Sequence, residues 1–371
     1  MQKAIKRFHL QLSPTDQNWF EGAWRDFDGS SSLYNQALDL DEILEHGKGI
    51  WGGMMLPDTM PLLANGMGDY LCARFTNNGT LSEIIEWCHE GAGWRHYGYS
   101  IDQAIAFDQM EYRQSNDIGD PEDSQLLARV SRVAMSEAAC KRAVRTQLEI
   151  GCRRVGGRKL AALVGVSWNE LSVWLRDPSG MPAPKCEQLA SALGIDQREM
   201  MRQDWEAALS HSQSVLKVRA DLAWPYAVAG QAFERLGCPE DAVKMYEAGV
   251  KKLGSSSSFT AHWSSVSDSG TGKFAVDRLL ALAKDDFELT VKEYLKAIVE
   301  KKVRNFWFTC ADTATKEGDH NAAYEYLCAA GWDFYYSNDI LEILQAMKAS
   351  AKLAGFPTLE AILELHIGSL V

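Results

Sequence analysis

The clearest alternation of hydrophobic and polar positions lies in the first third of the chain. Residues 70–75 (YLCARF) and 84–89 (IIEWCH) both show the two-residue period of a β-strand. Residues 77–79, Asn-Asn-Gly, tolerate positive φ and therefore favour a turn between the two runs. The apolar positions expected to share a face are Leu71, Ala73 and Phe75 in the first run and Ile85 and Trp87 in the second. The pattern predicts a β-hairpin.

A helical signal follows the second run. Ser100 can cap the first turn of a helix, and Gln103, three residues on, completes a capping box. Ile101, Ala104 and Ile105 then recur at helical spacing. Two strands followed by a helix predict an α+β fold for the N-terminal part of the chain.

The middle of the chain predicts two short helices separated by a tight turn, within residues 160–175 (LAALVGVSWNELSVWL). Gly165 can adopt the left-handed conformation that ends the first helix. Ser167 and Glu170 form a second capping box that begins the next helix. The residues expected to face inward are Leu160, Ala161, Leu163, Val166, Leu171, Trp174 and Leu175. This layout is typical of a helix-turn-helix.

Two later segments, 223–250 and 307–330, alternate small and bulky residues at the offsets of paired helices. Small residues let two antiparallel helices touch, and bulky residues fill the gaps to the next pair. The positions are Ala229, Gly230, Phe233, Gly237, Ala242 and Tyr246 in the first segment, and Cys310, Ala311, Ala314, Gly318, Ala323 and Leu327 in the second. Both segments resemble tetratricopeptide repeats, and residues 341–366 add a weaker third pair. The resemblance implies a groove for a peptide or protein, or a buttress for neighbouring domains.

Charge divides the chain into three parts. The whole chain has 38 Lys/Arg and 50 Asp/Glu, a formal charge of −12 that, spread evenly, would repel DNA. However, residues 1–125 hold 8 basic and 20 acidic side chains, residues 126–202 hold 13 and 7, and residues 203–371 hold 17 and 23. We therefore predict a multidomain protein with an α+β N-terminal domain over 1–120, an all-α helix-turn-helix-like segment over 126–202 and an α-helical repeat domain over 203–371.

The stretch from Met55 to Phe107 carries an ordered set of motifs. It runs from Leu56-Pro57 through Gly66-Met-Gly-Asp-Tyr-Leu71 to Ile85-Glu-Trp-Cys-His-Glu90. This order resembles the core of the SUKH superfamily, which covers bacterial immunity proteins against polymorphic toxins and fungal cell-wall synthesis regulators. The resemblance implies a non-enzymatic module that binds a protein partner, such as a toxin domain, and inhibits it by occlusion.

In such a module, an acidic and aromatic surface would face a basic partner. The residues expected to bind the partner are Asp69, Glu86, Trp87, Glu90 and Trp94. Trp87 or Trp94 would be the apolar anchor, although Trp87 could equally belong to the core.

The middle segment supports a different function. Its motif, continued by Pro182 and by Leu189-Ala-x-x-Leu-Gly-Ile195, resembles the Cro/repressor-type helix-turn-helix family and implies a DNA-binding transcription regulator. The residues that would contact DNA are Arg153, Arg154, Arg158, Lys159, Trp168, Asn169 and Ser172. Gly156 and Gly157 replace the Thr-Gln entry usual in that family, so a purely structural role stays open. A third alternative is a tetratricopeptide adaptor for a protein assembly.

Catalytic and metal chemistry are weakly signalled. Glu86, Cys88, His89, Glu90 and His96 include zinc-ligand types, but alternation along a regular strand would place Cys88 and His89 on opposite faces. We therefore expect no metal site. Since no nucleophile-and-base set shows a local signature, we also expect no catalytic residues, no cofactor and no enzyme activity.

The same sequence predicts a cytoplasmic protein with no membrane partner. The eight cysteines are scattered singly, which is typical of reduced thiols. No window reaches 18 consecutive apolar residues, and the first residues lack the apolar segment of a secretory signal.

Overall fold

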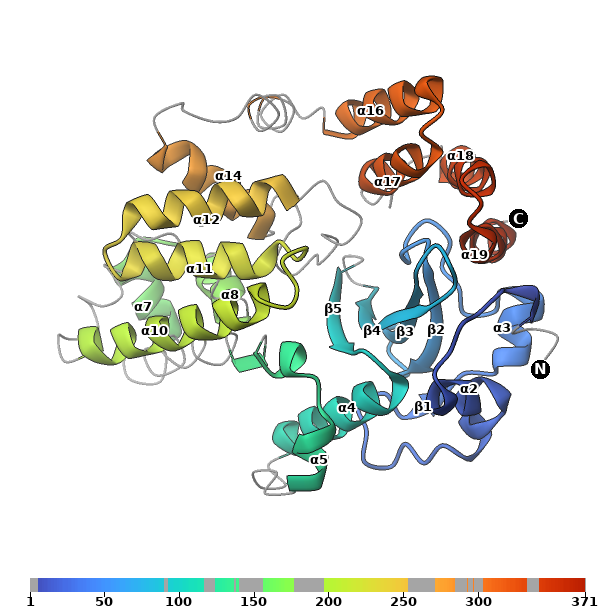
Figure 1. The fold of residues 1–371 in the computed structure, drawn as a ribbon. Helices are drawn as coiled ribbons and strands as arrows, with labels where there is room; N and C mark the ends of the chain where they lie inside the picture. Colours follow the sequence, from blue (N-terminus) through green and yellow to red (C-terminus); the bar gives the residue numbers. More distant parts are fainter. Residues whose placement is uncertain are drawn as a thin grey trace. The chain divides into compact units, whose positions relative to one another are not determined.

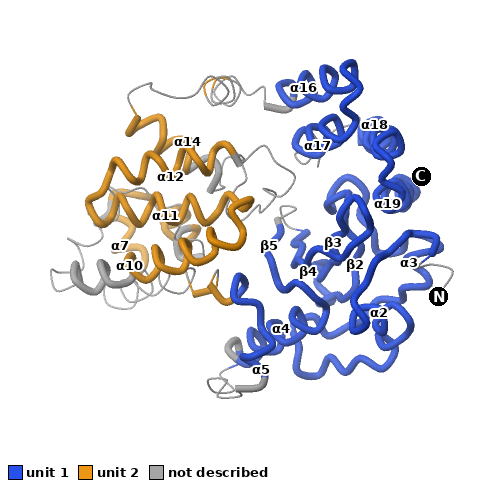
Figure 2. The backbone as a smooth tube through the Cα atoms, in the orientation of Figure 1, with its two compact units in different colours: residues 1–134, 300–371 blue, residues 135–299 orange. Residues whose placement is uncertain are grey.

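The computed structural model describes residues 6–89, 93–116, 124–136, 138–139, 156–176, 197–252, 271–283, 292, 296, 303–331 and 340–370. It divides into two compact units (Figures 1 and 2). Unit 1 comprises Met1–Ala134 and Glu300–Val371, and unit 2 comprises Met135–Val299. This division differs from the three consecutive domains predicted above. Residues 300–371, expected to form one repeat domain with 203–299, belong to the unit that contains the sheet.

Unit 1 is built around a five-stranded sheet in which every neighbouring pair of strands is antiparallel (Figure 1). The strands lie in the order of the sequence, so the sheet is a meander. Their bounds are β1 Gln36–Ala37, β2 Thr59–Ala64, β3 Tyr70–Phe75, β4 Leu81–Cys88 and β5 Gly93–Gly98. An α+β fold near the N-terminus, followed by helices, agrees with the prediction at this coarse level.

The predicted hairpin is β3–β4, although the second strand differs from the prediction at both ends and stops at Cys88. The first strand has the expected bounds, but the second begins at Leu81 rather than at residue 84. The Thr76 N–H donates to the Thr80 carbonyl oxygen at 2.9 Å, so the ladder resumes as soon as the turn closes. Gly79 has a φ of +86°, and a Cβ there would lie 2.2 Å from the carbonyl oxygen of His9, so only glycine fits.

The helices of unit 1 include α2 Pro14–Glu21, η1 Ala23–Asp26, α3 Leu40–His46, α4 Ile101–Ser115, α5 Ser124–Arg129, α16 Val303–Glu317, α17 His320–Gly331, α18 Ile340–Leu353 and α19 Pro357–Gly368. Helix α4 begins as predicted, because the Ser100 Oγ accepts the Gln103 N–H at 3.3 Å. The Gln103 side chain reaches back to the N–H of Tyr99 at 3.0 Å. Ile101 and Ala104 are buried, and α4 packs against β4 and β5.

The last helix joins the end of the chain to the sheet. His366 of α19 is fully buried, and its Nε2 lies 3.2 Å from the carbonyl oxygen of Thr59 at the start of β2. The Gly52 N–H donates to the Ser369 Oγ at 3.1 Å. A Cβ on Gly52 would lie 2.3 Å from the carbonyl oxygen of His366, so this approach requires glycine.

Unit 2 is helical in its described part, with α7 Gly157–Val164, α8 Trp168–Arg176, α10 Gln197–Leu216, α11 Trp224–Arg235, α12 Pro239–Lys252 and α14 Thr271–Leu282. Helices α11 and α12 pack as the predicted pair. A Cβ on Gly230 would lie 2.6 Å from the ring of Tyr246, so the small residue makes room for the bulky one. The second predicted pair, α16–α17, is also present but lies in unit 1. Within the described parts of the chain, no helix has both the length and the apolar character needed to span a bilayer.

The burial of His366 predicts a pH-dependent stability. Burial lowers the pKa of His366 from 6.5 to about 4, so folding favours the neutral ring. Its contribution is therefore complete above pH 6.5 and is lost as the pH falls from 6.5 towards 4. Between pH 7.5 and pH 5, this one group should remove about 2 kcal/mol from the free energy of unfolding of unit 1. Urea unfolding followed by tryptophan fluorescence at the two pH values measures it.

The matched variants are His366→Gln and His46→Gln, since His46 is exposed. The loss between the two pH values should shrink in the first variant and persist in the second. An equal loss in the wild type and in His366→Gln would contradict the assignment.

Candidate functional site

The turn between β2 and β3, residues 65–69, displays one large apolar side chain. The Asn65 Oδ1 accepts the N–H of Met67 at 2.8 Å and the N–H of Asp69 at 3.2 Å, which ties the turn together from inside. Gly66 and Gly68 take positive φ values of 73° and 101°. Met67, at the tip, is 73% exposed. The turn therefore presents an apolar side chain on a hydrogen-bonded scaffold.

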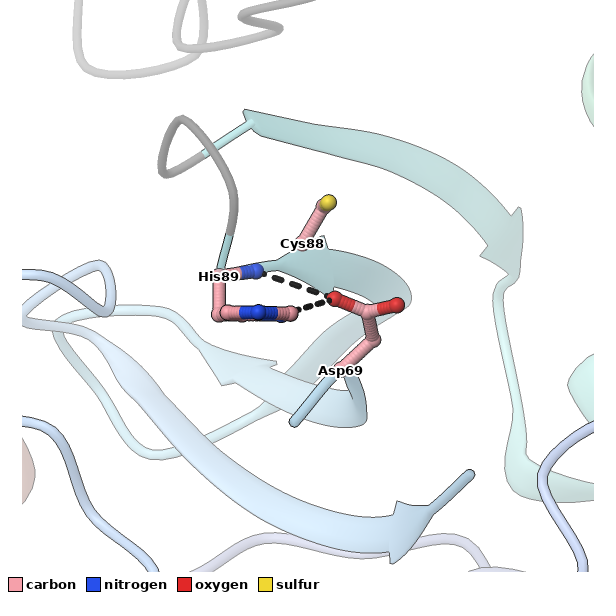
Figure 3. Close-up of side chains that lie close together, drawn as sticks. All are labelled: Asp69, Cys88 and His89. Atoms are coloured by element: carbon pink, nitrogen blue, oxygen red, sulfur yellow. Dashed lines mark hydrogen bonds and ion pairs between the residues drawn. The ribbon is translucent and has the colours of Figure 1, made fainter. Parts of the chain in front are cut away.

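Asp69 closes this turn and meets the end of β4 (Figure 3). Its Oδ1 accepts the backbone N–H of His89 at 3.0 Å and lies 2.8 Å from the His89 Nδ1. Its Oδ2 accepts the Asn65 side-chain N–H at 3.0 Å. Burial alone would raise the pKa of the Asp69 carboxyl, but the hydrogen bonds from His89, Asn65 and Cys88 outweigh it and lower that pKa. Asp69 is therefore held as a carboxylate.

Cys88 lies close to both Asp69 and His89, although alternation along a strand predicted that Cys88 and His89 would lie on opposite faces. The possible ligand atoms of Asp69, Cys88 and His89 all lie within 4.8 Å of one another. The expectation that Cys88 and His89 point to opposite faces was wrong, because β4 ends at Cys88 and His89 already lies in the following turn. Carboxylate, thiol and imidazole are all metal ligands, so these three side chains could hold a metal ion.

The same group does not resemble a nucleophilic cysteine site. A cysteine nucleophile is activated by an imidazole that contacts its sulfur. Here both Cys88 and the His89 ring bond to Asp69, so the carboxylate lies between them. The arrangement favours ligation or local order over thiol activation.

An exposed tryptophan lies beside this group. Trp51 is 38% exposed, and its ring centroid lies 6.3 Å from the His89 ring. A Cβ on Gly68 would lie 3.1 Å from the His89 Nδ1, so glycine lets the ring sit against the turn. We call Trp51, Met67, Asp69 and His89 together the Met67 face. Sequence patterning missed Trp51 and Met67, although the Gly-Met-Gly order of the turn was a signal that Met67 would be exposed.

Trp87 and Trp94, the two candidates for the apolar anchor, both lie in the core. This corrects the expectation for Trp94, whereas for Trp87 it agrees with the alternative that the side chain belongs to the core. Trp87 is 0% exposed and Trp94 is 1% exposed. The Trp87 Nε1–H donates to the Met54 carbonyl oxygen at 3.1 Å, and its ring stacks on Tyr70. Both tryptophans stabilise the sheet by burial and cannot reach a partner in this structure.

The predicted acidic residue Glu86 is also turned inward. It forms an ion pair with Arg95 and accepts the hydroxyl of Tyr34 at 2.7 Å. Burial, and then the charge of Glu86, raise the pKa of nearby Asp108 to about 7. Glu86 therefore contributes to an internal network and offers little to a partner. Glu90 lies outside the described residues.

The two short helices and the tight turn predicted within residues 160–175 form as α7 and α8. Gly165 has a φ of +66°, and Ser167 and Glu170 exchange the two hydrogen bonds of the capping box at 2.8 and 3.1 Å. Trp168 is exposed, and a Cβ on Gly157 would lie 2.1 Å from its ring. Gly157, which replaces a residue usual in the family that this segment resembles, thus leaves room for the Trp168 ring.

The predicted DNA-contacting residues divide into three groups. Arg158, Lys159 and Asn169 are exposed. Ser172 is half-buried, and its hydroxyl donates to the Asn169 carbonyl oxygen at 2.8 Å. Arg153 and Arg154 lie outside the described residues.

Comparison with known proteins adds no relative. No family model matches the chain. No match is found among curated proteins or among solved structures either.

Proposed function

We propose that this chain is a non-enzymatic immunity protein, in which unit 1 binds a basic toxin domain and occludes it. The proposal extends the resemblance of residues 55–107 to the SUKH superfamily. The observation that carries it is the combination of strong acidity with an exposed apolar face on one unit.

The acidity is concentrated in unit 1. This unit holds 16 Lys/Arg and 30 Asp/Glu, a net charge of −14, whereas unit 2 holds 22 and 20, a net charge of +2. A field of this sign speeds the encounter with a basic partner and disfavours acidic ones. The partner of unit 1 should therefore be a basic protein.

The Met67 face supplies the apolar contact that charge alone does not. Met67 and Trp51 are large exposed side chains, and Met67 stands on a turn that is already ordered by Asn65. A preordered contact residue loses little conformational entropy on binding. Trp51 and Met67 thus take the anchoring role that sequence analysis gave to Trp87 and Trp94.

The test co-expresses the full chain with the product of the neighbouring gene in a host that this product kills. The wild type should restore growth, and Met67→Glu should not, because a charge at the centre of an apolar contact weakens binding. Calorimetry on the purified pair should show an affinity loss of about tenfold or more for Met67→Glu.

The matched control is Leu353→Glu, which makes the same charge change at a residue of unit 1 that is 64% exposed. It should rescue growth like the wild type. The proposal fails if the full chain neither binds nor neutralises the neighbouring product. If Met67→Glu and Leu353→Glu bind the partner equally well, the Met67 face is not the partner-binding surface.

A second candidate function, DNA binding by α7 and α8, is favoured by one observation. Two short helices are joined by a tight turn, and Arg158, Lys159 and Asn169 are exposed on them. Basic side chains at the opening of the first helix suit phosphate contacts, and Asn169 at the start of the second suits a base edge.

We expect a regulator to bind duplex DNA with an affinity that falls steeply as salt is added. The double variant Arg158→Glu/Lys159→Glu should weaken binding and reduce the slope of log affinity against log salt by about 2, one for each lost phosphate contact. Lys217→Glu, at an exposed position of the same unit, is the control. Fluorescence anisotropy measures both, and a salt slope unchanged in the double variant would exclude this mode.

A further inference from the structure

We propose that Asp69, Cys88 and His89 form a zinc site at the end of the β3–β4 hairpin. Its ligands would be one Asp69 carboxylate oxygen, the Cys88 Sγ and the His89 Nδ1. The inference goes beyond the proposed function and does not depend on it. Asp69 and His89 also belong to the Met67 face, but the variants and the measurement that test the zinc site differ from those that test partner binding.

The geometry is close to what zinc requires. One ligand atom of each residue lies within 4.8 Å of the other two, and the Asp69 Oδ1 lies 2.8 Å from the His89 Nδ1. Zinc bonds of about 2.0–2.3 Å in a tetrahedron place ligand atoms roughly 3.3–3.8 Å apart. Small side-chain rotations suffice: the Asp69–His89 pair opens, and any separation wider than the tetrahedral value closes by about 1 Å at most.

The backbone already holds the three residues in place. Tyr70 of β3 is paired with Trp87 of β4. Asp69, just before β3, and Cys88, the last residue of β4, therefore come next at the open end of the hairpin. The His89 N–H is tied to Asp69 at 3.0 Å, and Asn65 holds the second carboxylate oxygen at 3.0 Å. An outer partner of this kind orients a metal-binding carboxylate.

The ligand types select zinc among common divalent ions. A thiolate and an imidazole are poor ligands for Mg²⁺ and Ca²⁺ and good ones for Zn²⁺. On binding, the Cys88 thiol loses its proton, and the His89 ring keeps a single proton on Nε2, leaving Nδ1 free to coordinate. The carboxylate and thiolate then balance the two charges of the ion. The fourth position is left to water.

Co²⁺ serves as the spectroscopic probe of the full chain, followed by displacement with Zn²⁺. We expect about one equivalent of Co²⁺ to produce a thiolate-to-cobalt charge-transfer band and the visible absorption of a tetrahedral site, and Zn²⁺ to abolish both. Cys88→Ser should remove the charge-transfer band. It should also lower zinc affinity by more than the roughly 10- to 100-fold cost of losing an outer partner.

Cys238→Ser, at an exposed cysteine of unit 2, is the matched control and should keep both signals. His89→Gln should weaken zinc binding while leaving sulfur available to the ion. Far-UV circular dichroism verifies that each variant is folded. The site is refuted if the full chain gives no charge-transfer band with Co²⁺, or if Cys88→Ser binds both ions as the wild type does. Loss of partner binding with an intact cobalt spectrum would instead count only against the proposed function.

Discussion

Unit 1 depends on the close approach of α19 to the segment between α3 and β2. The backbone of α19 comes so near that Gly47 and Gly52 have no room for a side chain: a Cβ at these positions would lie 3.1 and 2.3 Å from carbonyl oxygens of the helix. His366 then donates its buried N–H to the first residue of β2. Trp51 directly precedes Gly52, so the same contact that closes the unit also fixes the backbone beside the Met67 face. The end of the chain thus helps to position a surface formed mainly by residues near its beginning.

This closure also explains why charged side chains are buried at the sheet. Arg74 of β3 is 6% exposed and bonds to Asp58 and Glu83 at distances of 2.6 to 3.0 Å. Burial raises the pKa of Tyr324 on α17, and the Asp58 charge raises it further. Tyr324 of α17 therefore lies close enough to this ion-pair network to sense its charges. Removing one member of such a network leaves the others buried and uncompensated, which is costly.

Caps and turns formed by neighbouring residues were predictable from the sequence, whereas contacts between segments far apart in the sequence were not. Both capping boxes, the Gly165 helix end and the Gly79 turn depend on residues a few positions apart, so they were predicted correctly. The membership of residues 300–371 in unit 1 depends on Gly52 meeting α19, more than 300 residues later, and no periodicity encodes that contact. Glu86 and Trp94 were expected at a partner surface because of their residue types, yet Glu86 pairs internally with Arg95 and Trp94 is buried. The Asp69–Cys88–His89 group was missed because the predicted strand was extended to His89, one residue beyond the observed end of β4 at Cys88.

The internal pairing of Glu86 changes how acidity contributes to partner binding. The Glu86 carboxylate is already bonded to Arg95 and Tyr34, and because the ion pair cancels in the net charge, the total of −14 for unit 1 is unaffected by it. Long-range attraction follows that net charge, whereas specificity follows the groups that remain exposed. A basic partner would therefore be attracted by unit 1 as a whole and be distinguished from other basic proteins at the Met67 face. On this argument, substitutions of paired acidic residues alter stability first, and substitutions at the Met67 turn alter recognition.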